Sequence, residues 1–239
     1  FSNMPNALKR YIPSLWNSGF NGTNGFYQIE YYYLSSLAEL YVYGLNEYFI
    51  WQNILNACNE FFTGCMKFNA PQVLNIAEKA KRLYNEKTQL RLQIYSEESG
   101  TDLNAGWIYN GIKTPSLNQI AEEMNQLISD TTASQQTIIH GDFCFSNILY
   151  DFRTKSIKVI DPRGIDIEGD QCIYGDIRYD IAKLAHSVIG MYDFIIAGYF
   201  SYKENEAYNI EYEIYSTLTI TKVQYFFKNS IFGGMNIKY

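Results

Sequence analysis

Residues 140–147 read His-Gly-Asp-Phe-Cys-Phe-Ser-Asn and hold side chains that suit the transfer of a phosphoryl group. Asp142 precedes Asn147 by five residues, and a second carboxylate, Asp161, follows after a stretch long enough to form a hairpin. In phosphoryl transfer one Asp accepts or orients the proton of the attacking hydroxyl, while an Asn oxygen and another Asp hold Mg²⁺ against the nucleotide phosphates. Mg²⁺ is a hard cation, which explains why all the ligands in such a set are oxygens.

The tripeptide His-Gly-Asp by itself would be interpreted as a loop with a capping Asp. A larger set of residues comprises His140, Asp142, Asn147, Asp161 and Asp180. This set favours phosphoryl transfer instead, because its spacings resemble those of a known family of phosphotransferases. We interpret His140 as a structural residue that hydrogen-bonds the loop rather than as a proton shuttle, and His186 as a packed helix residue.

Charged residues follow the second carboxylate. The guanidinium of Arg163 could hold a phosphate or a substrate carboxylate in a bidentate manner, or it could brace the loop through a salt bridge, and the sequence leaves both open. The acidic residues beyond it are Asp166, Glu168, Asp170 and Asp176. Solvated loop charge is favoured for them over a surface that faces a cationic substrate.

Short strands and a turn surround this set of residues. Residues 136–139, 148–150 and 157–160 have the composition of strands, and residues 151–155 supply a turn between the last two. The sequence therefore predicts a small hairpin that carries Asn147 and Asp161 at its two ends.

Most of the remaining chain has helical patterns. Ser36 with Glu39 and Ser116 with Gln119 have the spacing of a capping box. Apolar residues recur at helical spacing in several segments. We predict a helix that starts at Leu37 and others over residues 47–62, 73–95, 117–128, 181–190 and within 208–227.

The chain before these helices is rich in glycine and aromatic residues. Residues 26–34 are apolar and aromatic and predict a strand. Gly19, Gly22 and Gly25 precede it at every third position, and we interpret them as a simple turn rather than as a phosphate-binding loop.

The composition predicts a folded chain with one large domain or two small ones. It has 239 residues, of which 47% are hydrophobic and 18% charged, unlike a disordered chain. The net charge of −6 argues against binding to nucleic acid or anionic lipid, because both attract clustered Lys and Arg.

The longest apolar stretch, residues 187–200, contains Asp193 and is shorter than the roughly 18 to 20 residues of a membrane span. We predict a buried helix there and no membrane span.

Cysteine usage and the first residues favour a reducing, cytoplasmic setting. The four cysteines form no CxxC pair and the chain has only two histidines, which argues against zinc and favours free thiols. Residues 1–19 contain Lys9, Arg10 and two prolines where a signal peptide would have an apolar segment.

The segment HGDFCFSNIL, followed by VIDPRG, resembles the catalytic loop and metal-binding strand end of the aminoglycoside phosphotransferase and choline kinase family. The resemblance implies an α+β, protein-kinase-like fold with a mainly helical C-terminal lobe. It also implies Asp142 as the catalytic residue, Asn147 and Asp161 as Mg²⁺ ligands, and ATP or GTP as co-substrate. The later segment GDIRYD is similar to one in which Asp180 would brace the catalytic loop from beneath.

The segment QIEYYYLSSLAELYVYG resembles the last strand of the N-terminal lobe, the hinge and the next helix of that family. Backbone groups near Glu30, Tyr31 and Tyr33 would then meet the adenine. Residues 1–34 would be a remnant of the N-terminal nucleotide-binding lobe and residues 35–239 the catalytic lobe. IDPRG and the tyrosine-rich hinge look most like family members associated with bacterial capsule and surface-sugar genes.

The sequence departs from the family in its N-terminal part. No Lys or Arg occurs between Arg10 and Lys67, so the usual glycine-rich loop and phosphate-pairing lysine are missing from this chain. Two functions remain open. The first is transfer of a γ-phosphate from a nucleoside triphosphate to a hydroxyl of a sugar, an aminoglycoside or an amino alcohol. The second is a pseudokinase that binds a nucleotide or a protein partner.

Overall fold

The computed structural model describes residues 4–128, 132 and 135–237, in which helices and strands are mixed as the predicted α+β class requires. The helices are α1 (Leu37–Val42), α2 (Tyr48–Cys65), α3 (Ile76–Ser99), α4 (Leu117–Leu127), α5 (Ile177–Val188), α6 (Tyr192–Ile196) and α7 (Leu218–Lys228). The strands are β1 (Leu15–Asn21), β2 (Asn24–Ile29), β3 (Ser35–Ser36), β4 (Trp107–Tyr109), β5 (Ile112–Thr114), β6 (Gln136–Ile138), β7 (Ile148–Asp151), β8 (Ser156–Val159), β9 (Tyr174–Asp176), β10 (Phe200–Glu206), β11 (Asn209–Ile214), β12 (Ile231–Phe232) and β13 (Met235–Asn236). Short 3₁₀ turns include η1 (Lys9–Tyr11), η2 (Gln72–Leu74) and η4 (Phe145–Asn147).

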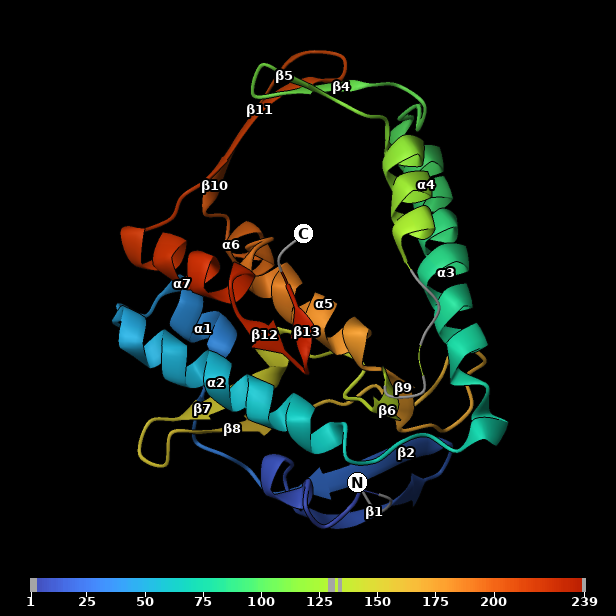
Figure 1. The fold of residues 1–239 in the computed structure, drawn as a ribbon, viewed down its shortest axis with the longest axis vertical. Coiled ribbons are helices and arrows are strands. Elements are labelled where there is room, and N and C mark those ends of the chain that lie inside the picture. The colour runs from blue at the N-terminus through green and yellow to red at the C-terminus, as the bar shows by residue number, and fades with distance from the viewer. Residues whose placement is uncertain (1–3, 129–131, 133–134, 238–239) are drawn as a thin grey trace.

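Figure 1 shows two parts that meet at α5. Helices α1, α2, α5 and α7 gather around the β7–β8 hairpin, while α3 and α4 lie side by side along the opposite edge. The four-stranded sheet β10-β11-β4-β5 connects the far end of α3 and α4 with the region of α6 and α7. β6 pairs with β9, which leads directly into α5, and the candidate site lies there.

Local hydrogen bonds start two helices where the sequence predicts. The Ser36 side chain accepts from the backbone N–H of Glu39, whose carboxylate accepts from the N–H of Ser36, and α1 begins at Leu37. Ser116 and Gln119 make the same reciprocal pair before α4. The capping-box predictions are confirmed, because these bonds satisfy donors that the first turn leaves free.

The predicted hairpin is confirmed and joins a three-stranded sheet. β7 and β8 are antiparallel with Ile148 opposite Val159, and β3 pairs with the other edge of β7. The turn between β7 and β8 follows Asp151, whose carboxylate accepts from the N–H groups of Arg153 and Thr154. This sheet places the ends of β7 and β8 beside the catalytic-loop segment.

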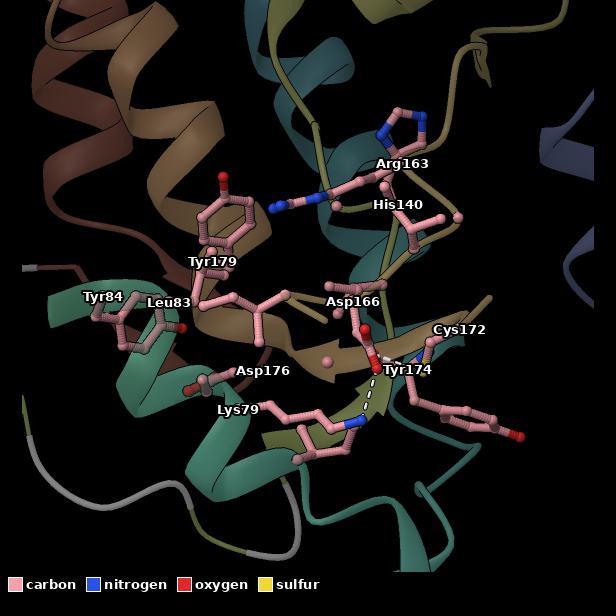
Figure 2. Close-up of a pocket in the computed structure, with 18 residues that line it drawn as sticks. Lys79, Leu83, Tyr84, His140, Arg163, Asp166, Cys172, Tyr174, Asp176 and Tyr179 are labelled. Carbon is pink, nitrogen blue, oxygen red and sulfur yellow. Dashed lines mark hydrogen bonds and ion pairs between the residues drawn. The ribbon is translucent and has the colours of Figure 1, made fainter. Parts of the chain in front are cut away.

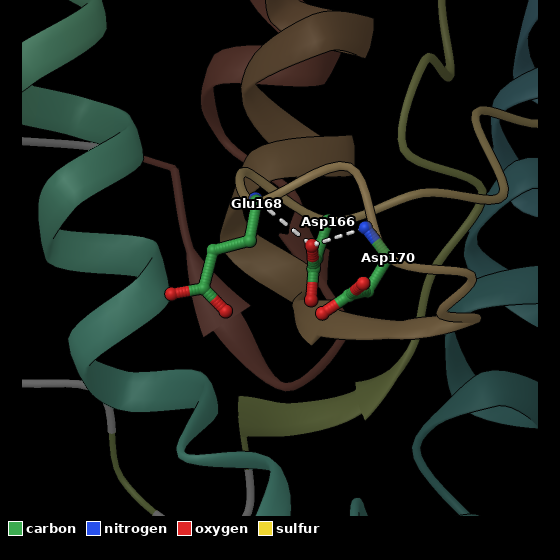
Figure 3. Close-up of side chains that lie close together, drawn as sticks. All are labelled: Asp166, Glu168 and Asp170. Atoms are coloured by element: carbon green, nitrogen blue, oxygen red, sulfur yellow. Dashed lines mark hydrogen bonds between the residues drawn. The ribbon is translucent and has the colours of Figure 1, made fainter.

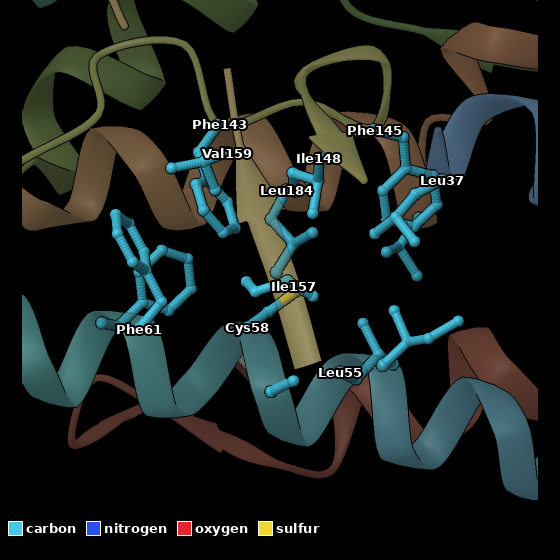
Figure 4. Close-up of a cluster of buried hydrophobic side chains, with 14 of the residues drawn as sticks. Leu37, Leu55, Cys58, Phe61, Phe143, Phe145, Ile148, Ile157, Val159 and Leu184 are labelled. Carbon is cyan, nitrogen blue, oxygen red and sulfur yellow. The ribbon is translucent and has the colours of Figure 1, made fainter. Parts of the chain in front are cut away.

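Aromatic and aliphatic side chains fill the space between α2, α5 and this hairpin (Figure 4). Fully or nearly fully buried members of this core include Leu37, Leu55, Cys58, Phe61, Phe143, Phe145, Ile148, Ile157, Val159 and Leu184. Phe143 stacks on Phe61 with ring centroids 5.0 Å apart and packs against Phe62 at 4.8 Å. The residue after Asp142 is therefore held in the core of the protein.

We expect Phe143→Ala to reduce the free energy of unfolding by about 3 to 5 kcal/mol, because it removes a fully buried ring and leaves a cavity. Urea denaturation of both proteins measures this difference. Phe152→Ala is the matched control, because Phe152 is 47% exposed in the hairpin turn, and its loss should be much smaller. Equal losses in the two variants would contradict the packing described for Phe143.

The N-terminal segment differs from the prediction. β1 and β2 form an antiparallel hairpin in which Leu15 lies opposite Ile29, so the strand predicted over residues 26–34 ends at Ile29. Beyond this pair the N–H of Glu30 still donates to the carbonyl of Ser14, but the next residue on that side is Pro13, which has no N–H to continue the pairing. The predicted glycine turn is also shorter: Gly22 has a φ of 64° in the turn, but the two flanking glycines lie within the strands.

Two predictions in the C-terminal part were wrong. Residues 209–214 are strand β11 rather than helix, since Ile210, Tyr212 and Ile214 alternate with polar residues and pair with β10 and β4. The apolar stretch 187–200 is not one buried helix. Helix α5 ends at Val188 near Gly190, where a side chain would meet the carbonyl of His186, and α6 begins after a break.

No helix in the described ranges is both long enough and apolar enough to cross a membrane, as predicted. Cys58 and Cys65 are buried free thiols, and Cys144 and Cys172 are half-buried free thiols, as predicted.

Candidate active site

The loop after β6 is held from beneath by one buried carboxylate. Asp180 lies on α5, is 0% exposed, and accepts hydrogen bonds from the backbone N–H groups of His140 at 2.6 Å and Gly141 at 2.8 Å. Pairing of β6 with β9, which leads directly into α5, brings the two segments together. The bracing role that the family resemblance implied for Asp180 is confirmed.

Gly141 permits a close approach within this loop. Its φ is 82°, and a Cβ at this position would lie 2.7 Å from the Cβ of Arg163. Only glycine adopts this backbone conformation freely, and only glycine avoids the contact. The loop of Asp142 and the segment after Asp161 can therefore pack directly against each other.

Burial raises the pKa of Asp180 to about 7, although the two N–H hydrogen bonds oppose the rise. The folded state thus holds this proton more tightly than the unfolded chain, and the contribution of Asp180 to stability falls as the pH rises from about 4 to 7.

We expect the free energy of unfolding to fall between pH 5 and pH 8 by about 2 to 3 kcal/mol more in the wild type than in Asp180→Asn. Urea denaturation at both pH values measures the difference, and equal pH dependence would contradict it.

Asp142 follows Gly141 and is bound by two side chains. Its Oδ1 accepts from the Lys183 ammonium at 2.8 Å, and its Oδ2 accepts from the Asn147 amide at 3.2 Å. The Asp142 side chain keeps 40% exposure, so a hydroxyl can still reach it. Burial opposes the charge of Lys183, but the hydrogen bond and the charge of Asp142 outweigh burial and raise the pKa of Lys183.

Sequence reasoning missed Lys183. The available signal was its position three residues after Asp180, which places both side chains on one face of α5. Because Asp180 holds the backbone of His140 and Gly141 and Lys183 holds the side chain of Asp142, the same helix fixes both the loop and the side chain of the predicted catalytic residue.

The hairpin β7–β8 brings Asn147 and Asp161 to the same place. The backbone carbonyl of Asn147 accepts from the N–H of Ile160 at 3.0 Å, so Asp161 comes one residue beyond this pair. The Asn147 amide also donates to the backbone carbonyl of Asp142 at 3.0 Å. The structure therefore gathers all three residues predicted from the sequence, with their roles still to be tested.

These residues fit a hard cation. The amide nitrogen of Asn147 donates to Asp142, and its Oδ1 accepts only a long hydrogen bond of 3.5 Å from the Ser146 hydroxyl, so this oxygen can still bind a ligand. Asp161 is exposed, and among the described residues none forms a hydrogen bond or ion pair with its carboxylate. Its φ of 55° is uncommon outside glycine, and such conformations concentrate at functional sites. Asn147 Oδ1 and the Asp161 carboxylate would hold Mg²⁺, which supplies positive charge to phosphate oxygens when bound.

His140 has the predicted structural role. It is 3% exposed, its Nε2 lies 2.9 Å from the carbonyl oxygen of Ile160, and burial lowers its pKa. His186 differs from the expected packed position: it is exposed on α5, with its ring 4.6 Å from that of Tyr192.

The predicted hinge segment contacts β8, where the ammonium of Lys158 lies 4.8 Å from the centre of the Tyr32 ring. Glu30 accepts hydrogen bonds from Ser14 and from the Tyr32 hydroxyl. Tyr31 is 81% exposed and Tyr33 is 94% exposed. Their predicted contact was through backbone groups, so nucleotide binding near Glu30, Tyr31 and Tyr33 stays a prediction.

The acidic stretch is tied to α3 rather than merely solvated. Lys79 contacts Asp166 at 2.6 Å and Glu168 at 3.0 Å, and Arg82 contacts Glu168 at 2.9 Å. Figure 3 shows how the loop curls around Asp166, whose Oδ1 accepts from the N–H groups of Glu168 and Asp170. The interpretation as solvated charge was therefore wrong for Asp166 and for Asp176, whose side chains are buried, whereas Glu168 and Asp170 are exposed as it requires. Further along, Asp176 caps α5 and pairs with Arg178.

One cavity adjoins the loop, and a second lies beside Lys183. The cavity in Figure 2 has a volume of about 50 Å³ and lies between α3 and the chain near His140 and Arg163. The second has a volume of about 360 Å³ and lies between α3, α4 and α5. Ligand pockets typically enclose some 300 to 1,000 Å³, so only the second of these two is large enough for a small molecule.

Comparisons with known proteins give matches in structure and none in sequence. No protein-family model matches the chain, and no curated protein sequence matches it. The chain is similar in structure to an aminoglycoside-3'-phosphotransferase of type VIII, with a TM-score of 0.43 and 14% sequence identity. The similarity covers 78% of this chain and 64% of that protein, so the chain corresponds to less than two thirds of its relative.

Proposed function

We propose that the chain is a Mg²⁺-dependent phosphotransferase that moves the γ-phosphate of ATP or GTP to a hydroxyl of a small molecule. The observation that carries this proposal is the joint position of Asp142, Asn147 and Asp161. The Asn147 amide bonds Asp142, and the hairpin that starts at Asn147 returns to Asp161. The resemblance of residues 140–164 to the aminoglycoside phosphotransferase and choline kinase family supports the same chemistry.

Each residue has a distinct task in this proposal. Asp142 accepts or orients the proton of the attacking hydroxyl, and Lys183 with Asn147 fixes its two oxygens. Asn147 and Asp161 hold the metal. Asp180 keeps the loop in place through His140 and Gly141, because catalysis of this kind depends mainly on positioning and charge.

A second candidate function is nucleotide or partner binding without efficient turnover. The sequence between Arg10 and Lys67 favours this second function, because it contains no Lys or Arg that could pair with nucleotide phosphates. Among the described residues before β3, the strands are only those of the β1–β2 hairpin.

Phosphorus NMR of the full chain with MgATP or MgGTP and a panel of sugars, amino alcohols and aminoglycosides separates the two functions. A new phosphate-ester signal together with nucleoside diphosphate is the result expected of a phosphotransferase. Tight nucleotide binding without any ester or diphosphate would favour the second candidate. The variant Asp142→Asn identifies any signal that comes from a contaminating enzyme, because that signal would persist.

A further inference from the structure

The larger cavity lies on one side of Asp142. Its walls come from α3, α4 and α5, and they include Lys183, whose ammonium contacts Asp142 at 2.8 Å. Among its described lining residues, none comes from β7, β8 or the predicted hinge segment. The cavity therefore borders Asp142 through Lys183, and none of its described walls comes from the strands that carry Asn147 and Asp161 at their ends.

The charge of this cavity is unusual for an acidic chain. The net charge of the chain is −6, yet the cavity is lined by Lys87, Arg91 and Lys183. No carboxylate occurs among the described residues that line it. Apolar and neutral polar side chains complete the walls, namely Leu83, Tyr84, Thr88, Ala121, Met124, Asn125, Ile128 and Tyr179. A cationic molecule would be repelled from this space.

Two of these cations, Lys87 and Arg91, form no ion pair with a described carboxylate, and neither does the nearby Arg163. Lys183, in contrast, is paired with Asp142. The salt bridge that the sequence left open for Arg163 is thus not formed in the described part of the chain. In Figure 2 the Arg163 side chain extends toward Tyr179, which lines both cavities.

Like charges gathered in this way destabilise one another. Burial and the charges of Arg163, Arg91 and Lys183 lower the pKa of Lys87. A bound anion would relieve this repulsion and would accept charge-assisted hydrogen bonds from the ammonium and guanidinium groups.

On the basis of the phosphotransferase function above, we propose that the acceptor is an anionic hydroxyl compound. Its carboxylate or phosphate group binds Lys87 and Arg91 between α3 and α4, while its hydroxyl faces Asp142 across Lys183. Cationic aminoglycosides and amino alcohols are then poor acceptors, and the substrate class narrows to molecules such as sugar acids or sugar phosphates.

Four acceptors built on one sugar test the charge preference: galactose, galactosamine, galacturonate and galactose 6-phosphate. Transfer is measured for the full chain with MgATP and MgGTP, together with calorimetric binding of galacturonate and galactose. The variants are Lys87→Gln and Arg91→Gln. Lys81→Gln is the matched control, because Lys81 is an exposed lysine on the same helix and does not line the cavity.

We expect the wild type to favour the anionic sugars in kcat/KM, and each cavity variant to reduce that value by about 10- to 100-fold through KM, the effect of a lost charge-assisted hydrogen bond. Nucleotide affinity and the Lys81→Gln protein should be unchanged. Equal kcat/KM for galactose and galacturonate, or a preference for galactosamine, would overturn the proposal. Weaker nucleotide binding in Lys87→Gln would also overturn it, by placing these cations at the nucleotide.

The binding measurement separates this proposal from the function on which it rests. Galacturonate binding that requires Lys87, without transfer to any acceptor, would support the anion site and contradict the phosphotransferase. Transfer to galactose without any binding of galacturonate would support the phosphotransferase and overturn the anion site.

Discussion

Asp142→Asn is expected to reduce turnover by about 10²- to 10⁴-fold, the usual contribution of a general base, with nucleotide affinity nearly unchanged. The side chain of Asp142 keeps 40% exposure and is fixed by Lys183 and Asn147, so it can meet a hydroxyl in a defined orientation. An amide keeps this shape but cannot accept the proton. Initial-rate kinetics and calorimetric titration with the nucleotide give the two quantities.

Asp151→Asn is the matched control for this experiment. It makes the same chemical change in the hairpin turn, where the Oδ1 that accepts from Arg153 and Thr154 is retained in the amide. This control should keep the wild-type rate. A nearly full rate in Asp142→Asn would show that Asp142 does not carry the chemistry.

Asp161→Ala is expected to remove the dependence of nucleotide binding on Mg²⁺. In the wild type the metal would join the exposed carboxylate of Asp161 and the amide oxygen of Asn147 to the nucleotide phosphates. Without Asp161 the metal loses its charged protein ligand. Calorimetric titration of ATP with Mg²⁺ and with excess EDTA measures the effect in each protein.

The backbone at this position calls for a second variant. Asp161 has a φ of 55°, in which alanine costs roughly 1 to 2 kcal/mol more than glycine does, whereas asparagine tolerates it better. Asp161→Asn therefore removes the charge with less strain and should also weaken the Mg²⁺ dependence. If both variants respond to Mg²⁺ as strongly as the wild type, Asp161 is not a metal ligand.

Several features could be predicted from the sequence because they depend on residues close together in the chain. The capping boxes at Ser36 and Ser116 form between residues three positions apart. The β7–β8 hairpin was predictable because a short turn leaves its two strands little choice of partner. The set from His140 to Asp161 was recognisable for the same reason, since its residues lie within one loop and one hairpin.

The prediction was wrong where pairing with another strand outweighed the local pattern. β11 pairs with β10 along its length, from Ile214 opposite Phe200 to Asn209 opposite Glu206, and its first two residues also pair with β4. β2 ends at Ile29 because pairing with its partner β1 does not continue past Pro13. In each case hydrogen bonds to another strand override the intrinsic preference of the segment.

The sequence by itself determined the chemistry that residues 140–161 could perform, because that chemistry follows from side-chain types at fixed spacing. The tertiary structure alone decided which other residues surround them. Lys183 meets Asp142, and Lys79 meets Asp166, across 41 and 87 positions of the chain respectively. Lys87 and Arg91 face the same cavity as Lys183 only because α3 packs near α5. Such contacts depend on how helices pack over the whole core, which no short stretch of sequence encodes.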